Sequence, residues 1–210
     1  SRVMAGISLK EQGVTSGIEP TYYAVKEAVF PFNKFAEVDV ILGPEMRSTG
    51  EVMGIGKSIS SAYLKAQLGA GERLVKKGKI FLSVQDRDKA LLKRVAKNFI
   101  DQGYSLVATE GTADFLHQAG FPVASIAKEA GDHLPILEMI KAGEIALVIN
   151  TVERNPQAIE ASYQIRRSAL NHRVPYYTTI AGAKAVSEGV ANLDHLEVAS
   201  LQEHHQTLKV

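Results

Sequence analysis

The stretch Y-S-L-V-A-T-E-G-T, residues 104–112, decides the fold of this chain. Its apolar run L-V-A ends at Thr109, and a short turn leads into A-D-F-L-H-Q-A-G, which has a helical period. A continuous apolar run that leads directly into a helix is typical of a parallel strand buried on both faces. The stretch therefore predicts a buried strand, a tight turn and a helix.

The turn between the predicted strand and helix allows two interpretations. Gly111 lets backbone N–H groups approach a ligand closely, and Thr109 and Thr112 add hydroxyl groups beside a helix N-terminus. The orphan N–H groups and the helix dipole both favour a phosphate or carboxylate at such a place. Thr and Gly are also ordinary residues of a plain N-capping turn, so this stretch alone leaves both interpretations open.

The same alternation of strand and helix repeats along residues 79–210. Predicted strands lie at residues 79–84, 104–109, 122–127, 146–151, 174–179 and 196–201, and helical patterns separate them. Gly103, Gly120 and Gly143 each follow a helical pattern, where a C-terminal cap is expected, and Pro156 stands where the first turn of a helix tolerates it. This alternation predicts an α/β domain of the Rossmann/flavodoxin-like kind, with a mostly parallel five- to six-stranded sheet and helices on both faces.

Residues 1–73 show a different pattern, and residues 74–78 form the predicted junction. We expect a short helical piece at residues 3–9, a strand within residues 22–32, a glycine-dense loop at 43–58 and a helix that ends at Gly69. One strand, one helix and long loops bury little core, so this α+β segment is expected to pack on further sequence.

Composition excludes several classes of protein. The chain of 210 residues has a net charge of +1, which gives no sign of nucleic-acid or acidic-membrane binding. The absence of cysteine excludes disulfides, thiolate metal sites and a cysteine nucleophile, and it fits a cytoplasmic protein. No apolar run approaches the length that a membrane-spanning helix needs.

The tripeptide Gly56-Lys57-Ser58 suggests a phosphate-binding loop, but its spacing excludes one. The motif G-x-x-x-x-G-K-[ST] would require glycine at position 51, where Glu51 stands. A carboxylate at that position would also repel a phosphate group.

Polar side chains follow most of the predicted parallel strands. In such sheets ligands bind beyond the carboxyl ends of the strands, so these side chains are expected to share one edge. They are Ser83, Lys89, Thr109, Thr112, Lys128, Asn150, Thr151, Thr178 and Thr179. Two lysines with several hydroxyls and an amide predict a pocket for a phosphorylated small molecule. Obvious acid–base groups are scarce beside them, which favours sensing over turnover, and no metal site is expected.

Five sequence blocks carry a resemblance over essentially the whole chain. They are V-K-E-A-V-F-P-F-N-K-F (25–35), L-G-P-E-M-R-S-T-G-E-V-M-G (42–54), A-T-E-G-T (108–112), V-I-N-T (148–151) and I-R-R-S-A-L (165–170). The chain resembles the C-terminal part of the large subunit of carbamoyl-phosphate synthetase. The resemblance implies that residues 1–73 are the tail of the second ATP-grasp half and that residues 79–210 are the methylglyoxal-synthase-like allosteric domain.

The resemblance also implies two effector sites. A nucleotide, UMP or IMP, would bind at Ser83, Lys89, Thr109, Thr112, Lys128, Asn150 and Thr151. Ornithine would bind between the two regions, at Glu27, Tyr176, Thr178 and Thr179. The chain departs from the family pattern at three positions: Val152 stands where a threonine is frequent, Tyr177 replaces an acidic residue and Phe30 replaces a leucine.

For the intact enzyme, the resemblance implies ATP-dependent synthesis of carbamoyl phosphate for arginine and pyrimidine biosynthesis. ATP and Mg or Mn ions would bind to the remainder of the large subunit, and a glutaminase small subunit would supply ammonia. The 210 residues themselves are expected to hold no cofactor and to be non-catalytic, and the domain is expected to form homo-oligomers. Two alternatives remain: a methylglyoxal-synthase-like phospholyase and a structural oligomerisation module.

Overall fold

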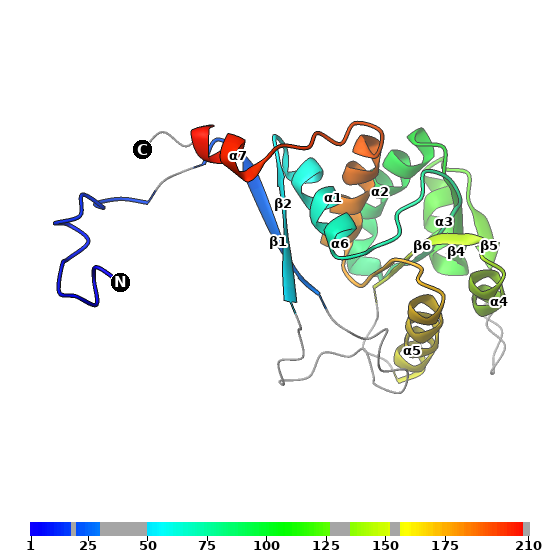
Figure 1. Cartoon of the computed structure of the whole chain (residues 1–210). Coiled ribbons are helices and arrows are strands. Elements are labelled where there is room, and N and C mark those ends of the chain that lie inside the picture. Colours follow the sequence, from blue (N-terminus) through cyan, green and yellow to red (C-terminus); the bar gives the residue numbers. More distant parts are fainter. Residues whose placement is uncertain (18–19, 30–49, 127–134, 152–155, 208–210) are drawn as a thin grey trace.

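The structure of the chain is a computed structural model, and it describes residues 1–17, 20–29, 50–126, 135–151 and 156–207. Three residues of interest from the sequence, Phe30, Lys128 and Val152, lie outside the described residues. Residues 1–17 lie away from the body of the molecule (Figure 1).

A five-stranded parallel sheet forms the centre of the larger unit, as predicted. Its strands are β3 (Lys79–Ser83), β4 (Ser105–Thr109), β5 (Ala124–Ile126), β6 (Ile145–Asn150) and β7 (Tyr176–Tyr177). They stand in the order β5-β4-β3-β6-β7, and every neighbouring pair is parallel. The expected α/β architecture is therefore confirmed.

Helices cover both faces of this sheet because alternate strand residues point to opposite sides. Ile80 and Leu82 of β3 pack in one core, with α2 (Lys89–Asp101), α3 (Glu110–Gln118) and α6 (Ile180–Gly189). Phe81 lies between them in sequence and packs in the second core, with α4 (Pro135–Lys141) and α5 (Pro156–Asn171). Short 3₁₀ helices, η2 (Asp86–Asp88) and η3 (Val190–Asn192), precede α2 and follow α6.

The strand order reverses beside β3. The chain moves from β3 outward to β4 and β5, and it then returns to the other side of β3 to form β6 and β7. In doubly wound sheets this reversal opens a crevice at the carboxyl ends of the two central strands. The candidate site is therefore expected beyond β3 and β6.

The N-terminal region adds an antiparallel pair and one helix. The pair consists of β1 (Tyr23–Val29) and β2 (Gly50–Gly56), and α1 (Ile59–Gly69) packs on it and on α6. The sequence predicts β1 and α1 but not β2, because the residues of β2 belong to a predicted glycine-dense loop. Ser58 caps α1 by accepting a hydrogen bond from the Ser61 backbone N–H at 3.2 Å, so the G-K-S tripeptide begins a helix.

Two predicted elements are wrong. Residues 196–200 form no strand, Val198 is almost fully exposed, and α7 (Leu201–Thr207) follows. Ser200 and Glu203 form a capping box at the start of α7, with the backbone N–H of Ser200 2.6 Å from Glu203 Oε2. Residues 3–9 form turns rather than a helix, and several of their apolar side chains are exposed.

The glycine caps are where the sequence placed them. Gly103, Gly120 and Gly143 have φ angles of 84°, 82° and 71°. This left-handed conformation is easy for glycine and strained for other residues, and it ends α2, α3 and α4.

The C-terminal segment returns to the N-terminal region (Figure 1). Glu197 accepts a hydrogen bond from Lys57 Nζ at 3.1 Å, and Asp194 pairs with Lys76. The ring of His204 lies 5.3 Å from that of Tyr22, centroid to centroid. These contacts join the C-terminal segment to the region around β1, β2 and α1.

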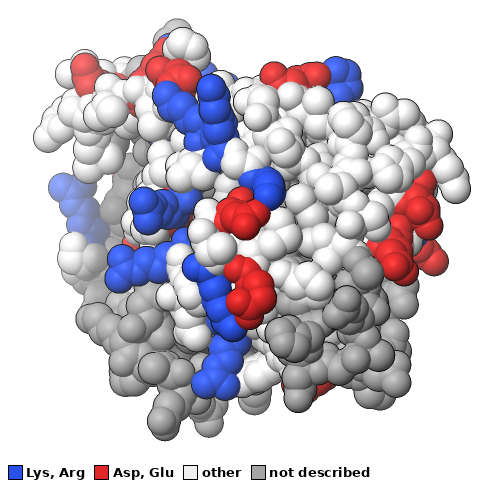
Figure 2. All heavy atoms as spheres, turned by 90° about the vertical axis from the view of Figure 1, so that its right-hand side faces the viewer, with Lys and Arg blue, Asp and Glu red and all other residues white. Residues whose placement is uncertain are grey.

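Charges of both signs are mixed on the face shown in Figure 2. Lys and Arg side chains form a column through the middle of this face, and Asp and Glu side chains lie beside it. A uniformly basic surface, which is typical of nucleic-acid binding, is not present on this face. Among the described residues, no helix is long and apolar enough to cross a membrane.

We predict that Gly54→Ala destabilises the chain by about 3 kcal/mol, because α1 lies directly on β2 at this position. A β-carbon at Gly54 would lie 2.0 Å from the Ala62 carbonyl oxygen and 2.5 Å from the Ala66 backbone nitrogen. Gly50→Ala in the same strand is the matched control, because a β-carbon there meets no atom within 4 Å. Urea unfolding measures both variants, and equal midpoints for the two would contradict this packing.

Candidate functional site

Two threonines hold the loop after β3 by hydrogen bonds. The loop lies at the carboxyl ends of β3 and β6, where the strand order of the sheet reverses. The Thr151 backbone N–H donates to the Ser83 carbonyl oxygen at 2.9 Å, and the Thr151 Oγ1 accepts from the Gln85 backbone N–H at 3.0 Å. On the other side, Thr112 Oγ1 accepts from the Val84 backbone N–H at 3.1 Å. Both threonine side chains are buried, so their hydroxyl groups position the backbone of the loop from inside the protein.

Lys89, the first residue of α2, reaches across to the turn at the start of α3. Its Nζ donates to the Gly111 carbonyl oxygen at 2.8 Å and lies 5.9 Å from the centre of the Phe115 ring. It also pairs with Asp86 at 2.7 Å. The lysine ammonium group is thus held beside the turn that contains Thr109 and Thr112.

Thr109 stands at the N-cap of α3, but its hydroxyl does not cap the helix. The residue has the extended conformation of a cap, with φ −63° and ψ 151°, and it makes no side-chain capping bond. Its Oγ1 instead donates to Thr112 Oγ1 at 3.3 Å. The backbone of Thr109 therefore has the conformation of an ordinary N-cap, whereas its hydroxyl group bonds to Thr112 at the sheet edge.

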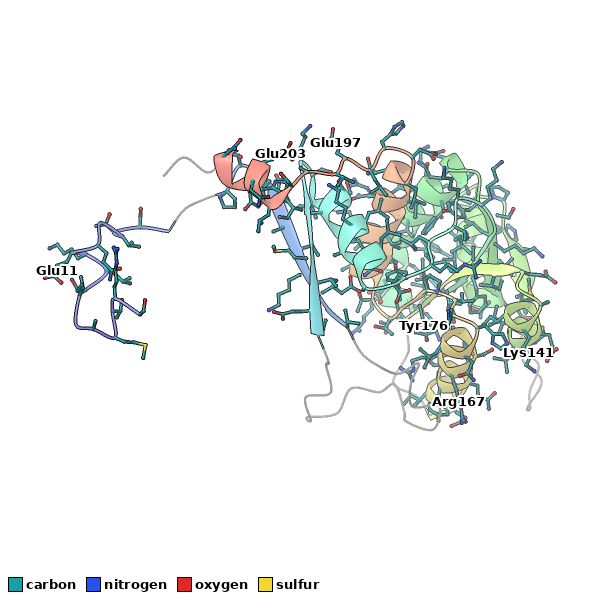
Figure 3. All side chains as sticks on the ribbon, viewed as in Figure 1. Glu11, Lys141, Arg167, Tyr176, Glu197 and Glu203 are labelled. Carbon is teal, nitrogen blue, oxygen red and sulfur yellow. The ribbon has the colours of Figure 1, made fainter. Side chains whose placement is uncertain are left out.

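A buried polar cluster lies behind β6. Asn150 Nδ2 donates to Ser162 Oγ at 3.0 Å and to the Tyr176 hydroxyl at 2.8 Å. Tyr176 lies between α5 and the sheet in Figure 3, and burial, its largest influence, raises the pKa of its hydroxyl. Arg166 of α5 lies close enough to lower that pKa in part. The arrangement fixes the amide of Asn150 at the edge.

The structure brings most of the predicted nucleotide residues to one edge. Hydrogen bonds join or position Ser83, Lys89, Thr109, Thr112, Asn150 and Thr151 there, while Lys128 lies outside the described residues. The ammonium group of Lys89, the hydroxyl of Thr109 and the N-terminus of α3 lie around one turn and can hold an anion.

A second polar cluster joins β1, α1 and β7. Gln67 Nε2 donates to Glu27 Oε2 at 2.7 Å, and the Tyr177 hydroxyl donates to Gln67 Oε1 at 2.5 Å. Tyr177 and Gln67 are both buried. Tyr177 is therefore part of the wall around Glu27.

The carboxylates of this second cluster are held in an unfavourable environment. Burial raises the pKa of Glu27, and burial together with the charge of Glu27 raises the pKa of Glu72. Burial, with both carboxylates nearby, raises the pKa of Tyr63 to about 12 and also raises that of Tyr177. Within the part of the chain that the structure describes, neither Glu27 nor Glu72 forms an ion pair.

A cavity of about 820 Å³ opens beside these carboxylates. Its walls include Glu27, Leu68, Glu72, Arg73, Leu170 and Arg173. Acidic and basic side chains therefore line the same cavity, which suits a ligand that carries both charges.

Of the other predicted ornithine residues, Tyr176 points away from the Glu27 cluster. Tyr176 directs its hydroxyl to Asn150, on the opposite side of β7 from Tyr177. Thr179 caps α6 by accepting from the Gly182 backbone N–H at 3.1 Å, and Thr178 beside it is exposed.

Gln67, Glu72, Tyr63 and Ser162 were not singled out from the sequence. Only the spacing of Tyr63 and Gln67, one helical turn apart on α1, offered a signal that they share a face. Within the described residues, no group of three or more His, Asp or Glu side chains could hold a metal ion.

Comparison with known proteins fits this geometry. Residues 92–178 match the family described as the MGS-like domain. The chain is 58% identical over 209 residues to the carbamoyl phosphate synthase large chain of Neisseria meningitidis serogroup A, covering 100% of this chain and 20% of that protein. It is 51% identical over 208 residues to the large chain of Ralstonia nicotianae, covering 99% of this chain and 19% of that one.

The fold is therefore that of an MGS-like α/β protein. Over its whole length the chain matches the C-terminal part of carbamoyl phosphate synthase large chains, and it spans about one fifth of the length of the curated relatives that it matches.

We predict that Glu72→Gln raises the melting temperature at pH 7 and has no effect well below pH 4.5, the ordinary pKa of the group. The pKa of Glu72 is raised in the folded state, so the folded chain binds more protons than the unfolded chain just above that pH. The wild type therefore loses stability as the pH rises through this window, and the glutamine variant loses less, because only Glu27 of the pair still titrates there. Calorimetric melting curves across the window test this, with Glu144→Gln, which removes an exposed carboxylate paired with Lys79, as control. Parallel curves for wild type and Glu72→Gln would contradict it.

Proposed function

We propose that this chain is the allosteric regulatory portion of a glutamine-hydrolysing carbamoyl phosphate synthase large chain. It binds a nucleotide, UMP or IMP, at the edge beyond β3 and β6 and thereby tunes ATP-dependent carbamoyl phosphate synthesis. The observation that carries the proposal is the convergence of Lys89, Thr109 and Thr112 on the first turn of α3. The switch point of a doubly wound sheet is the general place for such a ligand.

The chemistry of this edge supports a phosphate rather than a neutral ligand. Lys89 supplies a positive charge, and the first N–H groups of α3 supply donors that no turn of helix satisfies. Asn150 stands at the neighbouring strand end, where its amide N–H groups donate to Ser162 and Tyr176. These contacts position groups that bind an anion and not groups that transfer protons. The edge therefore fits regulation better than catalysis by this portion of the enzyme alone.

The second ligand of the proposal is ornithine, at the cluster around Glu27. The half-buried carboxylates of Glu27 and Glu72, whose pKa values are raised, would gain stability from an ammonium group. Arg73 and Arg173 in the wall of the same cavity could accept a carboxylate. Thr178 and Thr179, which lie at the end of β7, would complete the ornithine site.

The remaining assignments follow from the relatives, which are five times as long. Residues 1–73 would be the tail of the second ATP-grasp domain, residues 74–78 a junction and residues 79–210 the regulatory domain. The rest of the large chain would bind ATP and Mg or Mn ions, and a glutaminase small subunit would deliver ammonia. We place the enzyme in the cytoplasm, in arginine and pyrimidine biosynthesis, as an oligomer assembled partly through this domain.

We predict that calorimetric titration of the chain with UMP or IMP detects binding, and that Lys89→Ala weakens it about tenfold or more, the value of a hydrogen bond to a charged group. Lys97→Ala is the matched control, because Lys97 lies on the same helix and pairs only with the exposed Asp101 at 2.6 Å. Unchanged affinity in Lys89→Ala, or an equal loss in both variants, would refute the site. No binding by the folded wild type would refute nucleotide sensing.

For ornithine, we predict binding that Glu27→Gln abolishes, because the variant removes a negative charge from the cavity wall. Glu51→Gln serves as the control, since Glu51 lies on the neighbouring strand and pairs with the exposed Lys26 at 2.6 Å. The measurement is again calorimetric. Ornithine binding that survives Glu27→Gln would move the site elsewhere.

A further inference from the structure

We infer that Asp86 competes with anionic ligands for Lys89 at the proposed nucleotide site. The Asp86 carboxylate forms an ion pair with the Lys89 ammonium group, and it must move away when a phosphate group binds there. The inference rests on the proposed function, because it concerns the same lysine. It adds a residue that opposes ligand binding and so determines which anions the site accepts.

The ion pair between these residues is asymmetric. Asp86 Oδ1 lies 2.7 Å from Lys89 Nζ, and the exposed fraction is 84% for the Asp86 side chain and 19% for that of Lys89. Lys89 also donates to Gly111 at 2.8 Å, which holds it independently of the acid. The lysine is therefore the fixed partner, and the carboxylate is the one that can swing into solvent.

The backbone that carries Asp86 is anchored close to the site. The two residues before it, Val84 and Gln85, donate their N–H groups to Thr112 Oγ1 and Thr151 Oγ1 at 3.1 and 3.0 Å. Asp86 is thus kept within reach of Lys89 even when its side chain has moved away. A carboxylate tethered in this way has a high effective concentration at the lysine.

The second acid of the same 3₁₀ helix has a different partner. Asp88 Oδ2 accepts a hydrogen bond from Gln85 Nε2 at 2.7 Å, and no ion pair joins Asp88 to Lys89. Asp86 and Asp88 thus differ in what they contact although they lie two residues apart, which provides a natural control.

A competing carboxylate makes the site selective for charge. An exposed ion pair is weak, so a ligand that offers several anionic oxygens and fits the hydroxyls and the α3 N-terminus displaces Asp86. A ligand with a single carboxylate replaces the ion pair between Asp86 and Lys89 with another ion pair of the same kind, so its binding gains little free energy. The site should therefore favour phosphate esters over the more abundant singly charged carboxylates.

The test is calorimetric titration of UMP, IMP and inorganic phosphate into the wild type, Asp86→Asn, Asp88→Asn and Lys89→Ala/Asp86→Asn. We expect Asp86→Asn to bind each probe about two- to fivefold more tightly, as the loss of an exposed ion pair implies, and Asp88→Asn to bind as the wild type does. In the Lys89→Ala background, the Asp86 substitution should give no comparable gain. Because Asp86 is exposed, the fold should persist, and the melting temperature checks this.

The outcomes separate the two claims. Equal or weaker binding by Asp86→Asn, or the same gain in Asp88→Asn, overturns the competing role of Asp86 and leaves nucleotide binding standing. Binding by Asp86→Asn alone, with none by the wild type, supports strong competition. Absence of binding in both proteins overturns the proposed nucleotide site and this inference with it.

Discussion

A parallel strand that is covered on both faces must be apolar along its whole buried length, and β3 is where this constraint acts most strongly. Its three central residues, Ile80, Phe81 and Leu82, are no more than 1% exposed, and they contribute to two separate cores. With both faces filled by hydrocarbon, polar groups can gather only where the strand ends. The ligand edge is therefore a direct consequence of how the sheet is covered.

The constraint explains why most of the sheet could be predicted. Apolar runs flanked by helical patterns and glycine caps identified β3, β4, β5, β6 and β7. Strand β2 is not predicted because Gly54 and Gly56 weaken the pattern of a strand. Both glycines are required by the close packing of α1 on β2, which leaves no room for a β-carbon. Here a tertiary contact determined the residues, and no local pattern reports such a contact.

At residues 196–201 the sequence predicts a strand that the structure does not contain, because here a local pattern lacks a tertiary partner. Its apolar residues alternate as they would in a strand, but nothing pairs with them, and Val198 is 94% exposed. Ser200 and Glu203 already signalled the start of a helix. At the ligand edge, the positions were predictable because parallel strands end together. Their partners, such as Val84 for Thr112 and Gln85 for Thr151, depend on side-chain rotations and loop paths that the sequence does not report.

The return of the C-terminal segment has a consequence for how the chain is made. Lys57 and Glu197 are 140 positions apart, and their contact closes the region around β1, β2 and α1. A ribosome releases the N-terminal partner of this contact long before the C-terminal one. The antiparallel pair must therefore wait, without these last neighbours, while the residues between Lys57 and Glu197 are synthesised.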